Sequence, residues 1–159
     1  MGMVDPTLRT ALLAMAELVM AREPDEVIYR GSQPYMQRWH LVRKAAGDVE
    51  NVYIHRFIAD DAEVPHDHPW DSRSIVLSGQ YLECWQRTDT SATAYTTRFP
   101  GEIIDRPATH IHAICGVEPG TTTLFITGPK LRDWGFFTSE GFVPWRQYHG
   151  LPHDAQAPA

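Results

Sequence analysis

Histidines in two short patterns are the residues whose type and spacing could do chemistry in this sequence. His66 and His68 stand two residues apart, and His110 and His112 repeat the spacing further along the chain. On an extended strand, residues i and i+2 project to the same face, so each pair can turn both imidazoles toward one point. Neutral imidazoles crowded inside a protein leave ring nitrogens unsatisfied unless something coordinates them. The two pairs therefore predict a site for a divalent metal.

The chain that must position these histidines opens with a predicted amphipathic helix. Asp5 is a typical N-cap, Pro6 suits the first helical position, and apolar residues recur at helical spacing up to Glu23 and Pro24. Beyond Pro24 the helical period gives way to short apolar or alternating runs.

These runs predict about eight strands. They cover residues 35–42, 52–58, 75–85, 94–99, 102–106, 111–115, 121–127 and 134–138, and the turn signals fall at 46–48, 78–79, 100–101, 118–120 and 128–129. Intervals this short leave no room for crossover helices, so the strands should form an antiparallel sandwich or jelly-roll barrel.

The histidine segments also resemble the two sequence motifs of the cupins. The second cupin motif is Gly, five residues, Pro, one residue, Gly, two residues and His. Gly101, Pro107 and His112 match this motif, and Thr109 stands at the position of the second Gly. The first motif is His-x-His, then Glu after three or four residues and Gly after six more, and it resembles the segment from His66 to Gly79. Counting back from that glycine puts Ser72 where the motif has Glu.

The resemblance implies an all-β chain with one cupin-type jelly-roll barrel and an N-terminal α-helix. We expect the helix in residues 1–24, the barrel in 25–150 and a flexible tail in 151–159. Together with residues 125–130 and 134–136, the first motif also resembles small bacterial and phage cupin-like proteins. The implied metal ligands are His66, His68 and His112, without the usual carboxylate. His110 is the alternative third ligand, because it shares the face of His112 and a change of register would exchange the two.

A site of three neutral imidazoles leaves a divalent ion its full charge, which favours an anionic chelating substrate. In ligand type it is similar to the thiol dioxygenases and β-diketone dioxygenases among the cupins. This implies Fe(II) and a dioxygenase acting on a small molecule, although imidazole also suits Zn, Mn or Ni. One alternative is a metal-dependent isomerase, lyase or hydrolase without redox chemistry, and another is a cupin that binds a small ligand without catalysis. No catalytic acid or base is identified.

Five residues near the motifs are candidates for the substrate pocket. Trp70 could form a wall, Arg73 and Arg106 could clamp a substrate carboxylate, and His55 could act as a base. Ser72 completes the set as the residue that replaces the motif glutamate. The more ordinary explanations are core packing for Trp70, solvation or ion pairing for the two arginines, and a buried hydrogen bond for His55. The pattern assigns two further acidic residues, Glu83 and Glu102, to structural or solvent-facing positions.

Composition narrows the remaining function classes. The sequence of 159 residues has 14 Lys and Arg against 20 Asp and Glu, a net charge of −6, and no basic cluster, which argues against nucleic-acid binding. Two cysteines without C-x-x-C spacing favour a reducing cytoplasm. The apolar run 11–21 is too short to span a membrane and is broken by Glu17. The aromatic stretches 134–137 and 142–145 are typical of an outer face or a subunit interface, which is compatible with a homodimer.

Overall fold

Helix α1 (Pro6–Met20) begins where the sequence predicts it. The side chain of Asp5 accepts hydrogen bonds from the backbone amides of Thr7 and Leu8, at 2.9 and 3.1 Å, as an N-cap does. The helix ends at Met20, a few residues before the predicted stop at Pro24. The structure is a computed structural model that describes residues 2–42, 51–60, 64–86 and 92–151.

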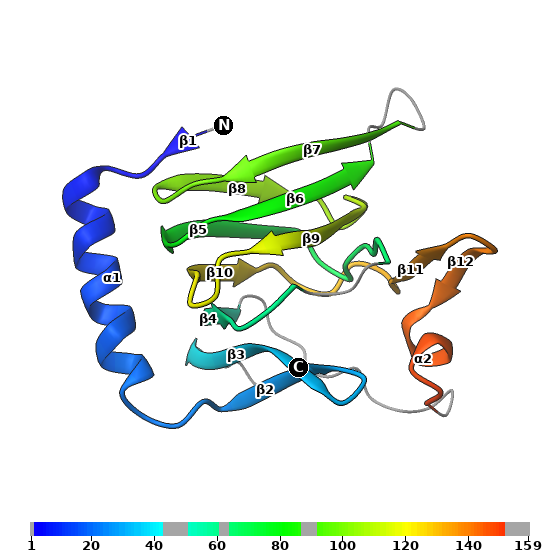
Figure 1. The fold of residues 1–159 in the computed structure, drawn as a ribbon, viewed down its shortest axis with the longest axis horizontal. Coiled ribbons are helices and arrows are strands. Elements are labelled where there is room, and N and C mark those ends of the chain that lie inside the picture. The colour runs from blue at the N-terminus through cyan, green and yellow to red at the C-terminus, as the bar shows by residue number, and fades with distance from the viewer. Residues whose placement is uncertain (1, 43–50, 61–63, 87–91, 152–159) are drawn as a thin grey trace.

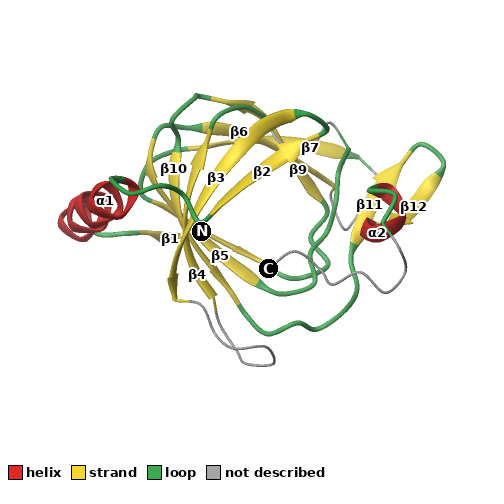
Figure 2. Ribbon diagram, turned by 90° about the horizontal axis from the view of Figure 1, so that it is seen from below, coloured by secondary structure: helices red, strands yellow, loops and turns green. Residues whose placement is uncertain are grey.

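Two antiparallel sheets form the barrel. The larger has seven strands in the order β1 (Gly2–Met3), β8 (Glu102–Arg106), β5 (Ser72–Ser78), β10 (Thr122–Thr127), β4 (Asn51–Phe57), β3 (Gln33–Val42) and β2 (Glu26–Arg30). The smaller has the order β7 (Thr93–Arg98), β6 (Tyr81–Gln86) and β9 (His112–Val117). Seen along the barrel in Figure 2, the strands curve around a common interior.

A hairpin and a short helix lie at the side of the barrel opposite α1. The hairpin pairs β11 (Gly135–Thr138) with β12 (Gly141–Pro144), and α2 (Trp145–Tyr148) follows it directly. In Figure 1 they stand at the right, and α1 runs down the left. The aromatic stretches 134–137 and 142–145 of the sequence thus form one unit beside the barrel.

Each of the eight predicted strands has a counterpart in the described residues, and the strands differ from the prediction in four respects. The run 75–85 divides into β5 and β6 at the turn signal 78–79, where Gly79 has φ of 68° and a Cβ would lie 2.7 Å from the Cα of Thr121. The short strands β1, β2 and β12 have no counterpart in the prediction. The predicted turn 46–48 and all of the predicted tail except Leu151 lie outside the described residues. No helix in the described part of the chain is long and apolar enough to cross a membrane.

The hydrophobic core consists of two clusters of buried apolar residues. One lies under α1, where Ala16 packs with Trp39, Ile54, Leu77 and Leu124. The other lies between the two sheets and consists of Met36, Phe57, Val76, Tyr81, Ile104 and Ile114. The second cluster is centred on the end of β5 near Gly79, which leaves the other end of the barrel, near Ser72, for polar residues.

Candidate metal centre

Backbone pairing brings the two histidine motifs together. The amide of His66 donates to the carbonyl of His112 at 2.9 Å, and the amide of His112 donates back to the carbonyl of His66 at 3.0 Å. The amide of His68 donates to the carbonyl of Ala108 at 3.1 Å. The segment 64–71 therefore lies antiparallel to the start of β9, and the side chains of both motifs share one region.

Three of the four motif histidines form one group. The Nε2 atoms of His68 and His112 are 2.9 Å apart, and one ring nitrogen from each of His66, His68 and His112 lies within 4.8 Å of the other two. Two nitrogens that each lie about 2.1 Å from one ion are at most about 4.2 Å apart. The group is thus close to the size that one ion requires. His110 does not belong to it, and lies instead with Glu83 and His112.

Burial keeps these three imidazoles neutral. Burial lowers the pKa of His66 to about 4 and that of His112 to about 3. For His68, burial and then the neighbouring His66 and His112 lower the pKa well below its ordinary value. Neutral imidazole is the form that binds a metal, so all three rings are ready to coordinate at pH 7. The donor set fits a divalent ion without a change of protonation.

Glu83, which the sequence assigns to a structural or solvent-facing position, lies at the centre of a buried hydrogen-bond network. Its side chain is 0% exposed and lies inside the barrel. Oε1 accepts hydrogen bonds from His112 Nδ1 and Arg106 Nε, both at 2.7 Å, and Oε2 accepts one from Arg98 Nε at 2.7 Å. Burial alone would raise the pKa of Glu83, but the imidazoles of His110 and His112 and the guanidinium of Arg106 lower it. Side chains alternate along β6, so Glu83 lies on the same face as Tyr81 and Trp85. This alternation is the feature of the sequence from which the inward position of Glu83 could have been predicted.

The two candidate clamp arginines lie in opposite environments. Arg106 is 4% exposed, and its guanidinium donates to Glu83, to Ser74 Oγ at 3.3 Å and to Tyr81 Oη at 3.1 Å. Its hydrogen-bond donors are therefore engaged within the protein. The placement of Arg73 in the pocket is corrected, because its side chain is 54% exposed and forms a surface ion pair with Asp105.

Aromatic rings surround the histidine group. Trp70 stacks on His68 with 4.7 Å between ring centroids and 11° between ring planes, and its predicted role as a pocket wall stays a prediction. The ring of Trp134 stacks on that of His68 with 6.1 Å between the centroids, and the ring centroids of Phe136 and His66 are 5.5 Å apart. These two aromatic residues come from the stretch expected at an outer face or an interface, and the structure instead places them against the candidate ligands.

The remaining pocket candidates lie deeper in the barrel. His55 is buried on β4, stacks on Phe125 at 4.9 Å, and accepts a hydrogen bond at Nε2 from Arg38 Nε at 3.0 Å. This bond occupies the lone pair that a base would use, so the structure does not favour the expected role of His55 as a base. Ser72 is buried at the start of β5, opposite Arg106 in the register.

Asp67, between the first two histidines, ties their loop to the C-terminal hairpin. Its carboxylate is buried and accepts hydrogen bonds from the amide of Gly135 at 2.9 Å and from Arg132. The backbone of His66 also pairs with Phe136. The loop that carries His66 and His68 is therefore held from both sides, by β9 and by β11.

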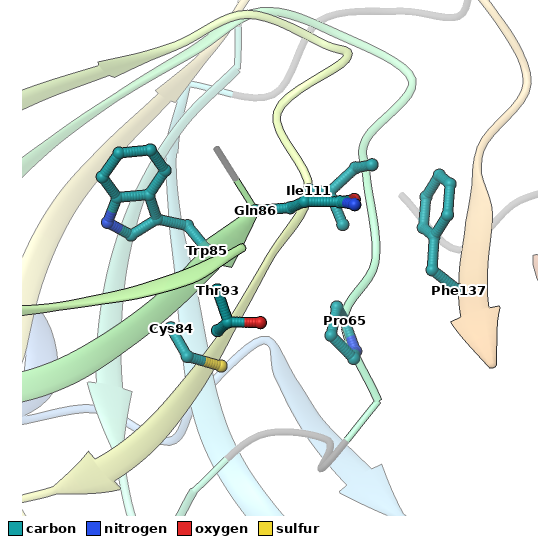
Figure 3. Close-up of a pocket in the computed structure, with 7 residues that line it drawn as sticks. All are labelled: Pro65, Cys84, Trp85, Gln86, Thr93, Ile111 and Phe137. Atoms are coloured by element: carbon teal, nitrogen blue, oxygen red, sulfur yellow. The ribbon is translucent and has the colours of Figure 1, made fainter. Parts of the chain in front are cut away.

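A pocket of about 210 Å³ lies next to the segments that carry the histidines. Figure 3 shows the side chains that line it, and they come from the loop before β5, from β6, β7 and β11, and from the residue before β9. Pro65 and Ile111 are the chain neighbours of His66 and His112, but no candidate ligand lines the pocket. The pocket is thus adjacent to the histidine group and separate from it.

Comparison with known proteins identifies the architecture. No family model and no curated protein matches the sequence. Among solved structures, a cupin superfamily protein from Desulfitobacterium hafniense DCB-2 is 18% identical, with a TM-score of 0.51 over 73% of this chain and 88% of that protein. The DMSP lyase DddQ from Ruegeria pomeroyi DSS-3 is 16% identical, with a TM-score of 0.51 over 66% and 52%. The Fe(II) form of HppE in complex with substrate is 14% identical, with a TM-score of 0.54 over 67% and 57%.

This chain spans about half the length of DddQ and of HppE. At these levels of identity the likeness concerns the fold. The prediction from the two histidine motifs is confirmed at that level: the chain has the cupin fold, an antiparallel β-barrel preceded by an α-helix.

Proposed function

We propose that this protein is a metal-dependent enzyme that holds one divalent ion through His66, His68 and His112 and acts on a small chelating anion. The observation that carries the proposal is the convergence of three neutral, largely buried imidazoles within 4.8 Å. No fourth His, Cys, Asp or Glu of the described residues joins this group. A structural metal site is usually closed by four protein ligands, whereas a catalytic site keeps a position open, so the three-ligand group favours catalysis.

The charges around the group favour an anionic substrate. The three imidazoles are neutral, so they do not reduce the charge of a bound divalent ion. The nearby carboxylates of Glu83 and Glu102 are balanced by the two guanidiniums of Arg98 and Arg106. The sum is positive once an ion is bound, and a chelating enolate or thiolate would be attracted to it.

The chain's own residues would orient the substrate and exclude water. Trp70, Trp134 and Phe136 line the histidine group and replace water with apolar surface, which strengthens the electrostatic interactions inside. A bound divalent ion would supply Lewis acidity and, as Fe(II), also a redox-active centre for the reaction of O₂ with a substrate, which itself supplies the electrons. We favour Fe(II) and a dioxygenase, in keeping with the ligand type, and HppE is an example of this fold that carries Fe(II).

A second candidate is a lyase, isomerase or hydrolase that uses the ion only as a Lewis acid. The neutral ligand set is compatible with this chemistry, because an ion that keeps its full charge polarises a carbonyl strongly. DddQ, which shares the fold, is a lyase.

The test is elemental analysis of protein purified without oxygen, followed by oxygen-electrode assays with cysteine and with acetylacetone as chelating probes. Iron together with probe-dependent O₂ uptake supports the dioxygenase. Stoichiometric zinc without uptake contradicts it, and turnover of a probe without uptake supports the Lewis-acid candidate. His66→Ala and His112→Ala should each abolish metal retention, while His110→Ala should keep most of it. Retention in His112→Ala with loss in His110→Ala would reverse the ligand assignment.

A further inference from the structure

The carboxylate of Glu83 lies on the side of His112 that faces away from His68. Nδ1 of His112 is 2.7 Å from Glu83 Oε1, and Nε2 of the same ring is 2.9 Å from His68 Nε2. The two nitrogens of one imidazole therefore meet different partners, the carboxylate on one side and the group of candidate ligands on the other.

Glu83 itself is not placed to bind the metal. Oε1 is shared by His112 and Arg106, and Oε2 is engaged by Arg98. Glu83, His110 and His112 also lie close enough to one another to be considered as a separate ion site. The two guanidiniums on Glu83 would repel a cation there, so charge argues against that use.

We propose that Glu83 is a positioning residue that fixes the tautomer and orientation of His112. A carboxylate oxygen can only accept a hydrogen bond, so Nδ1 of His112 must carry the hydrogen and Nε2 must present its lone pair. Metal-binding histidines commonly donate their second ring nitrogen to a carboxylate, which fixes the ring and raises its basicity. This inference rests on the proposed metal site.

The arrangement also accounts for the acid missing from the first motif. Ser72 stands where the cupin motif has its glutamate ligand, and no carboxylate joins the three histidines among the described residues. Glu83 supplies a carboxylate one residue further from the ion, through His112. Arg98 and Arg106 hold that carboxylate in place from both of its oxygens.

The first experiment measures the tautomer directly. Long-range ¹H–¹⁵N NMR of the uniformly ¹⁵N-labelled, metal-free full chain at pH 7.5 resolves the histidine tautomers, and His112→Ala assigns the signals of residue 112. We expect hydrogen on Nδ1. A predominant Nε2–H tautomer would overturn the proposal, and this result does not depend on any variant of Glu83 or on metal binding.

The second experiment measures metal affinity with Co(II) alone, by calorimetry and visible absorption. Glu83→Gln should keep one site per chain and weaken the Kd for Co(II) by about 10- to 100-fold. Glu102→Gln is the matched control, since Glu102 is also buried and paired with Arg98 but does not contact His112. Its Kd should stay close to the wild-type value, and Glu83→Asp should recover part of the loss.

The outcomes separate the two proposals. A folded Glu83→Gln protein with wild-type affinity overturns the positioning role and leaves the metal site intact. An equal loss in Glu102→Gln also overturns it, because the effect would then be a general one of the buried ion pairs. If the wild-type chain binds no Co(II), the proposed function fails, and the tautomer of His112 still decides the role of Glu83. If Glu83→Gln does not fold, the NMR result and Glu83→Asp decide.

Discussion

Replacing Arg106 by Met tests whether the buried charge network is a structural support of the barrel interior. The methionine keeps most of the apolar stem and removes the guanidinium that donates to Glu83, Ser74 and Tyr81. Removing one partner of a buried ion pair costs about 3–5 kcal/mol, because the other charge stays buried. Arg98 remains on the second oxygen of Glu83, so we expect the lower end, about 3 kcal/mol.

For a chain of this size, about 3 kcal/mol lowers the Tm by roughly 6–12 °C. The assay is thermal unfolding of the metal-free protein, followed by circular dichroism at pH 7.5 with a chelator present. The chain provides a matched control in Arg73→Met, because Arg73 lies on the neighbouring strand and its pair with Asp105 is exposed. Its Tm should stay within about 2 °C of the wild-type value. A decrease in Arg106→Met no larger than that in Arg73→Met would refute the reasoning.

Two further predictions concern groups beside the candidate centre. Burial, and then the guanidinium of Arg38, lowers the pKa of His55 well below the ordinary 6.5. As the pH falls, the imidazole therefore takes up a proton in the unfolded chain before it does so in the folded protein. The folded state thus loses stability as the pH falls below about 6.5. His55→Gln should flatten this acid slope by up to about 1.4 kcal/mol per pH unit, measured by urea unfolding at pH 7.5 and 5.5, and equal slopes would contradict the assignment. Asp67→Asn places an amide donor against Arg132, so it should cost about 1–3 kcal/mol and speed hydrogen exchange at Gly135 and Phe137. Unchanged protection of these two amides would show that Asp67 does not hold the hairpin.

Local patterns in the sequence were sufficient for much of the fold. Asp5 and Pro6 mark the start of α1 because capping is a property of neighbouring residues. The two-residue spacing of His66 and His68 reflects strand geometry and needs no knowledge of distant segments. The turn at Gly79 is equally local, since its positive φ favours glycine.

Features that depend on pairing between distant segments could not be predicted. Arg73 and Arg106 flank the two motifs in the same way, and only the register of β5 against β8 decides that Arg106 points inward and Arg73 outward. Glu83 is acidic and would normally be exposed, and its burial depends on guanidiniums from two other strands. Trp134 and Phe136 look the same in the sequence whether they cover an outer face or the histidine group, because only the pairing of β11 with the His66 loop distinguishes the two.

That pairing makes the loop of His66 and His68 dependent on residues that the ribosome adds late. The last barrel strand, β10, ends at Thr127. The backbone that pairs with His66 belongs to Phe136, and the amide that donates to Asp67 belongs to Gly135. Strands can begin to associate during translation, because chains fold progressively as they emerge. A nascent chain therefore completes its barrel strands before it acquires the hairpin that contacts the loop of the first two candidate ligands, so this loop is the last part of the histidine group to be held in place.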